Sequence, residues 1–144
     1  MTTRPSLQRL PDWPERLAAH LASHSATPFV WGSHDCVRFA AGAVHAITGR
    51  HILPADWSDR AEAARLLRSV GGLVPAVDAV LPRLWTTTLA QRGDVLMVCA
   101  PGPAGGWRHW LAVCDGARWW APSPQGLACG PAAQAVHAWG VAHG

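Results

Sequence analysis

Cys36 is the residue of this chain best suited to covalent chemistry. It follows Asp35 directly, within the stretch TPFVWGSHDCVRFAAGAVHAITG, and it begins a predicted helix over 36–47 that Gly49 closes. Backbone N–H groups at a helix N-terminus favour a thiolate, the nucleophilic form of cysteine. Asp35 is suited to cap the same helix. Cys36 is therefore a candidate nucleophile, although most cysteines of this kind are small core residues, and both interpretations stay open at this point.

The histidines supply the candidate bases. His109 stands near the start of a predicted strand and is the main candidate, because a cysteine nucleophile needs a base within hydrogen-bond reach. His34 is a substitute base by its position in sequence, but we interpret it as a loop or surface histidine. His20 and His24 are four residues apart on a predicted helix without a suitable third ligand, so they predict a solvated helix face. We predict no metal site and no cofactor.

The elements that must position these residues fall into two groups. Helices are predicted after Asp12, over 36–47, after Ser58, and briefly within LVPAVDAVLPRL. Strands follow, at 95–99 and on both sides of the Asp115-Gly116 hairpin signal, with a short one in GLACG and a helix or turn in PAAQAVHAWGV. Helices before an antiparallel sheet indicate an α+β fold.

The remaining chemistry-bearing residues have structural interpretations. Cys99, Cys114 and Cys129 lie on strand-like segments and are predicted to be core residues. Asp94, in the motif RGDV, is predicted to be a turn residue.

Composition limits the classes of function. The 144 residues, 49% hydrophobic and 15% charged, predict one globular domain over 1–144. Every basic residue is arginine, the net charge is +3 and no basic run occurs, so direct readout of nucleic acid is not predicted. No apolar stretch has the length of a membrane span or a signal peptide, and we expect synthesis in a cytoplasm. Nine tryptophans predict that some face a partner.

A family resemblance adds to these observations. The order of TPFVWG, DC, a small-residue helix, RGDVLMV and a histidine on a strand closed by DG resembles the NlpC-type cysteine peptidases. It is most like the short branch found among phage and prophage tail genes, which has WG-x-x-DC. The resemblance covers residues 27–139 or so. It implies a papain-like NlpC-type domain in which N-terminal helices pack on a small antiparallel sheet.

The same resemblance implies roles for particular residues. Cys36 matches the nucleophile, Asp35 matches the acid that precedes it, and His109 approximates the general base. Trp31 and Gly32 belong to the motif, whereas Phe29 stands where the family usually has a tyrosine.

Two further positions depart from the family pattern. Counted back from Asp115-Gly116, the histidine position falls on Trp110, so His109 is one residue early. A slip of one residue turns a strand side chain to the other face, so His109 can act as the base only if a bulge or a shifted turn re-aims it. The residue that orients the histidine should lie on the next strand, where Ser123 and Gln125 are the only side chains available. The predicted triad is incomplete.

The resemblance implies two alternative functions. In the first, the protein is a tail-tip cysteine peptidase in the virion, made in the bacterial host cytoplasm, which cuts peptidoglycan stem peptides during DNA delivery. In the second, it is a catalytically impaired structural or adaptor component of the tail tip. The predicted partners are tail hub and tip proteins, with peptidoglycan peptide as substrate if the enzyme is active.

Overall fold

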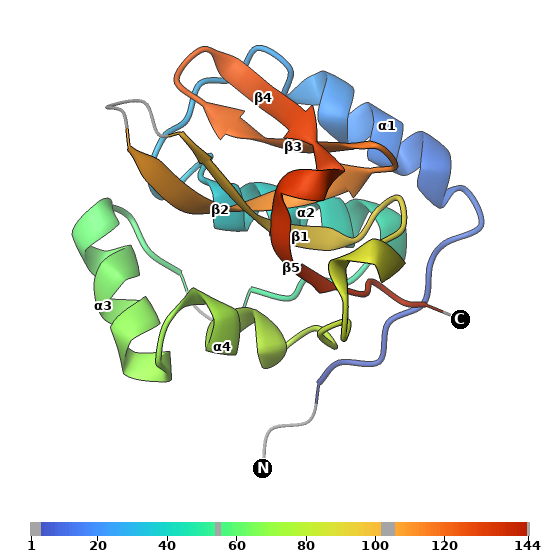
Figure 1. Cartoon of the computed structure of the whole chain (residues 1–144), viewed down its shortest axis with the longest axis horizontal. Helices are drawn as coiled ribbons and strands as arrows, with labels where there is room; N and C mark the ends of the chain where they lie inside the picture. The colour runs from blue at the N-terminus through green and yellow to red at the C-terminus, as the bar shows by residue number, and fades with distance from the viewer. Residues whose placement is uncertain (1–3, 54–55, 102–105, 144) are drawn as a thin grey trace.

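Helices occupy the first half of the chain and strands the second half (Figure 1). The structure is a computed structural model that describes residues 4–53, 56–101 and 106–143, without the side chain of Trp107. The α-helices within these ranges are α1 (Trp13–Ser23), α2 (Cys36–Thr48), α3 (Arg60–Val70) and α4 (Leu73–Asp78). The strands are β1 (Val95–Pro101), β2 (Trp107–Asp115), β3 (Arg118–Ser123), β4 (Gly126–Pro131) and β5 (Ala135–Trp139), with short 3-10 turns η1 (Thr87–Leu89) and η2 (Ala132–Gln134). The α+β prediction is confirmed.

The five strands form one antiparallel sheet in the order β4-β3-β2-β1-β5. Consecutive strands β1 to β4 are neighbours, whereas β5 returns to pair with the free edge of β1. The predicted final helix or turn is confirmed only at the 3-10 turn η2, and residues 135–139 form this last strand instead. Pairing with β1 buries Ala138 and Trp139, and this long-range gain outweighs the helical preference of the local alanines.

Helix α2 packs on one face of the sheet, where it contacts β2 and β3, while α1 packs against α2 (Figure 1). The buried stripe of α2 contains Ala40, Ala43, Val44 and Ile47. The small side chains of Ala40 and Ala43 let the helix approach the strands closely. Gly42 faces α1 and leaves room for it, since a Cβ at this position would lie 2.7 Å from Cε1 of the His20 ring on α1.

Strand β2 separates two groups of buried side chains. Leu111 and Val113 join the core shared with α2, whereas Ala112 and Cys114 belong to a second cluster on the other face of the sheet. The side chains of β2 therefore alternate regularly between the two faces over this stretch. This alternation decides which residues of β2 can face the N-terminus of α2.

The predicted core positions of the three other cysteines are only partly confirmed. Cys114 is buried and Cys99 is half-buried, but Cys129 is exposed on the edge strand β4. The core prediction for Cys129 is wrong because an edge strand has one side and part of each face open to solvent. In the described part of the chain, no helix has the length and apolar character needed to cross a membrane.

Candidate functional site around Cys36

Cys36 is the first residue of α2 and Asp35 is its N-cap. The Asp35 carboxylate accepts a hydrogen bond from the backbone N–H of Arg38 at 2.9 Å. This is the side-chain capping that the sequence predicted, and it fixes the start of the helix at the cysteine. The thiol is thereby held at the positive end of the helix dipole.

Asp35 is also completely buried and satisfies further donors. Its second oxygen accepts hydrogen bonds from the backbone N–H of Gly32 at 3.2 Å and from the indole Nε1–H of Trp57 at 2.7 Å. The guanidinium of Arg38 lies nearby, with Nε 3.8 Å from the same oxygen. Asp35 therefore ties the turn before α2 to residues 56–58, a link that the local sequence around Cys36 could not reveal.

The turn that precedes Asp35 depends on Gly32. Its φ is +85°, and a Cβ at this position would lie 2.4 Å from the carbonyl oxygen of Ser58. Phe29, which precedes the turn, donates its backbone N–H to Ser123 O at 2.9 Å, and its ring meets Trp31 edge to face at 5.0 Å. Phe29, Trp31 and Gly32 thus all help to hold the segment that leads into Cys36.

The thiol of Cys36 lies against strand β2. The backbone N–H of Leu111 and the first N–H groups of α2 stabilise its charged form, but burial dominates, and the Asp35 charge adds to it, so the pKa of Cys36 is raised to about 11. At neutral pH the resting thiol is therefore protonated. A base must remove the proton if this sulfur is to attack a carbonyl group.

His109 lies on the same face of β2 as Leu111. The pairing of β1 with β2 is regular from Val95↔Val113 to Pro101↔Trp107 and includes Cys99↔His109, so side chains two residues apart share a face. This pairing contains no bulge, so a bulge is not what sets the direction of His109. Strand alternation alone puts His109 on the α2 side, with its Cα roughly 7 Å from that of Leu111.

Trp110 occupies the opposite face of β2. It packs with the second cluster and donates its Nε1–H to Ala100 O at 3.4 Å. The position that matches the family histidine by counting is thus turned away from α2. His109 itself is exposed, and the hydrogen bonds of the described residues include none between its ring and Cys36.

Ser123 ends β3, and Gln125 lies in the turn between β3 and β4. The Ser123 hydroxyl donates to Gly126 O at 2.7 Å and accepts from the backbone N–H of Gln125 at 3.3 Å. Gln125 is exposed. Neither side chain hydrogen-bonds to His109 within the described part of the chain, so neither of these two candidates orients the imidazole.

Three histidines gather on the other side of the α2 N-terminus. His34 is buried and stacks on His24 with ring centroids 4.7 Å apart, while His20 stacks on Phe39 at 4.8 Å. His20 shares a hydrogen bond of 3.0 Å with Phe39 O, and burial lowers its pKa to about 4. The prediction of a solvated face for His20 and His24 is wrong, because both rings pack against Phe39 on α2. His34 lies in a loop, as predicted, but it is buried against the same ring and is not a surface residue.

A cleft of about 440 Å³ opens beside the turn that precedes Asp35. We call it the indole cleft, and it is lined by Trp31, Gly32, Ser33, Asp56, Trp57, Ser58 and Glu62. One wall comes from the turn before Cys36, and the other from the start of α3 and the segment before it. Cys36 is not among the described lining residues. Within the described ranges, no group of three or more His, Cys, Asp or Glu side chains could hold a metal ion.

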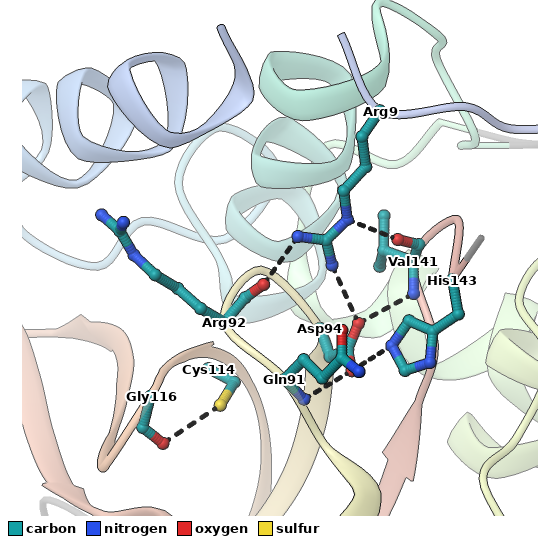
Figure 2. A network of polar contacts seen from close by, with 8 residues as sticks. All are labelled: Arg9, Gln91, Arg92, Asp94, Cys114, Gly116, Val141 and His143. Atoms are coloured by element: carbon teal, nitrogen blue, oxygen red, sulfur yellow. Dashed lines mark hydrogen bonds and ion pairs between the residues drawn. The ribbon is translucent and has the colours of Figure 1, made fainter. Parts of the chain in front are cut away.

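Asp94 of the RGDV motif lies in a separate polar network (Figure 2). Its carboxylate is fully buried and accepts hydrogen bonds from the N–H groups of Gln91 at 2.8 Å and Val141 at 2.9 Å. It also pairs with Arg9 at 3.2 Å and with Nε2 of His143 at 2.6 Å. The predicted turn role is confirmed by the Gln91 contact, but the sequence did not indicate that the carboxylate joins both ends of the chain.

Comparison with known proteins yields a family and no activity. No curated protein and no solved structure matches the chain. One family model matches residues 8–141, nearly the whole chain, and includes Cys36, His109 and the indole cleft. The chain therefore belongs to the family described as Domain of unknown function (DUF6950).

Proposed function

We propose that this protein is an NlpC-type cysteine peptidase of papain-like fold that acts on peptidoglycan stem peptides at a phage or prophage tail tip. One observation carries the proposal: the thiol at the N-terminus of α2 lies against the Leu111 amide, two residues along the same strand face from His109. A nucleophile at a helix start and a base on the adjoining strand are the two parts that acyl transfer requires.

The chemistry follows from the protonated state of Cys36. His109 takes the thiol proton as the sulfur attacks the peptide carbonyl, and it gives that proton to the leaving amine when the C–N bond breaks. Water then hydrolyses the thioester and restores the thiol. The N–H groups at the start of α2 and that of Leu111 stabilise negative charge on sulfur. Because burial holds the proton on the resting thiol, substrate binding has to precede deprotonation.

Purified peptidoglycan sacculi provide the direct test. We expect the wild-type protein to release muropeptides and Cys36→Ala to release none, while His109→Ala lowers the rate by about 10²-fold to 10⁴-fold. Cys129→Ala, an exposed cysteine on β4, and His137→Ala, a histidine on β5, are matched controls that should retain activity. Equal release by wild type and Cys36→Ala would refute the catalytic role.

A structural role at the tail tip, bound to hub proteins, is the second candidate. It is favoured by the raised pKa of Cys36 and by the engagement of Ser123 in its own turn, which leaves His109 without an orienting partner among the described residues. In this case infectivity and tail assembly should be the same for phage that carries Cys36→Ala, whereas deletion of the gene should give particles without a complete tip. A loss of infectivity with Cys36→Ala in fully assembled particles favours the peptidase.

A further inference from the structure

The indole cleft has the composition of a cation-binding site, and we propose that it binds an organic ammonium group, either an alkylammonium or a quaternary ammonium. Two indoles and two carboxylates line it, and none of its described lining residues is basic. The proposal does not depend on the cysteine chemistry, because Cys36 is not part of the described lining.

The aromatic walls are held in place for such a ligand. Trp31 is 41% exposed, and its edge-to-face contact with Phe29 at 5.0 Å fixes the ring at the cleft. The ring of Trp57 already holds a cation, since the Arg38 guanidinium carbon lies 4.4 Å from its centroid. Indole faces attract cations through the ring quadrupole. The cleft therefore offers one indole that is already paired with a cation and one that is still open.

The charge of the cleft is negative although the chain carries a net charge of +3. A hydrogen bond from Arg38 lowers the pKa of Asp56, so this carboxylate is ionised at neutral pH and is neutralised by the same arginine. Glu62 accepts a hydrogen bond from the Ser58 hydroxyl at 3.2 Å and forms no ion pair with the described residues. Glu62 thus leaves an uncompensated negative charge in the cleft that the exposed Trp31 also lines.

These two features favour a cation over a neutral sugar. A sugar ring could stack on an indole, but a neutral ring gains no charge–charge attraction from Glu62, and the Ser58 hydroxyl is already engaged with this carboxylate. An ammonium group needs only the aromatic face and the nearby carboxylate charge.

Choline is a suitable probe because a neutral control exists: 3,3-dimethylbutan-1-ol (neohexyl alcohol) has the same shape without the charge. Binding is measured by titration of the wild-type protein with each compound, monitored by NMR of the indole N–H signals of Trp31 and Trp57, which are assigned from Trp→Phe variants. We expect saturable shifts with choline and binding of the neutral compound that is about tenfold weaker. Equal binding of the two compounds, or no binding of choline, would overturn the proposal.

Matched variants locate the site. Glu62→Gln keeps the shape of the side chain and should weaken choline binding by about threefold to fivefold, whereas Glu15→Gln, an exposed acid on α1, should not. Trp31→Ala should weaken it by about tenfold, whereas Trp85→Ala, which is 87% exposed outside the cleft, should not. A well-dispersed NMR spectrum is required of each variant as the control that it is folded.

Two results on these variants would contradict the site. The first is an equal effect of Glu62→Gln and Glu15→Gln. The second is binding of N-acetylglucosamine as tight as that of choline and unchanged by Glu62→Gln, which would indicate a sugar site instead. Choline binding requires no turnover, so failure of the peptidase assay and failure of this titration are separate outcomes.

Discussion

Cys36 is subject to two opposing effects. The start of α2 and the Leu111 amide stabilise a thiolate, while burial and the neighbouring Asp35 carboxylate disfavour it. Burial dominates, and the pKa of about 11 means that on the order of one thiol in 10⁴ is ionised at pH 7. The sulfur is therefore protected from adventitious reagents in the resting protein, and its chemistry has to wait for a base.

This protection gives a measurable expectation for alkylation. With iodoacetamide at pH 7, Cys36 should react at least about tenfold more slowly than the exposed Cys129, because only the thiolate reacts and its population is small. The pKa is raised, so the rate at Cys36 should increase with pH from 7 to 10 without a plateau. Peptide mapping by mass spectrometry follows both sites in one sample. Faster labelling of Cys36 than of Cys129 at pH 7 would mean that the thiol is already activated.

Among the elements, the turn before α2 is the most constrained. Gly32 has a positive φ, and Ser58 O lies where a Cβ would be, so residues 56–58 close directly over the turn. That contact brings Trp57 to Asp35 and forms one wall of the indole cleft. A change at Gly32 should thus affect the cap of α2 and the cleft together.

A pair of glycine substitutions tests this constraint. Gly116→Ala introduces the strain of a positive φ of +76° with no atom within 4 Å of the new Cβ, and it should cost about 1 kcal/mol. Gly32→Ala adds a clash with the Ser58 carbonyl, and it should lower the free energy of unfolding by about 1–3 kcal/mol more. Urea denaturation measures both values. Equal losses would mean that residues 56–58 move away from the new Cβ without a measurable loss of stability.

The strands show which parts of the site could be predicted from the sequence. The cap of α2 was predictable, because Asp35 and Arg38 interact over three residues of chain. The face of His109 was not, since counting from the Asp115-Gly116 turn matched Trp110 to the family position and implied that His109 would need a bulge or a shifted turn, whereas the β1–β2 pairing is regular. Strand β5 was missed for a similar reason: its partner β1 lies about 40 residues earlier in the chain.

The burial of polar side chains was not predicted where it depends on contacts with another element. His34 looked like a loop histidine until Phe39 and His24 enclosed it. The hydrogen bond from Trp57 to Asp35 also joins two separate segments, and no sequence pattern links them. Local pattern thus predicts how elements begin and end, while the environment of a polar side chain depends on which elements meet around it.

For the whole molecule, Asp94 joins segments that are far apart in sequence. Arg9 contacts both the Asp94 carboxylate and the carbonyl of Val141, which is 132 residues further along the chain. The Val141 N–H returns to the same carboxylate (Figure 2). The N-terminal segment, the start of β1 and the C-terminal segment are therefore held by one buried ion pair network.

Replacement of this carboxylate should have a global effect. Asp94→Asn leaves the partly buried Arg9 without its counter-charge, and we expect the free energy of unfolding to fall by about 3 kcal/mol. Asp115→Asn, which breaks the more exposed pair with Arg92, should cost no more than about 1 kcal/mol. Chemical denaturation gives both values, and hydrogen exchange at the Val141 amide should accelerate only in Asp94→Asn. Similar losses in the two variants would reduce Asp94 to a surface contact.

The contacts of the shared Asp94 carboxylate also suggest that the packing of the elements does not depend on where the chain begins. Because Arg9 and Val141 already meet at one side chain, a short linker that replaces the residues before Arg9 and after His143 would join neighbouring segments. New ends could then be opened at the exposed Gly116, in the two-residue hairpin turn. Such a circular permutant would keep Cys36, His109 and the indole cleft on intact elements.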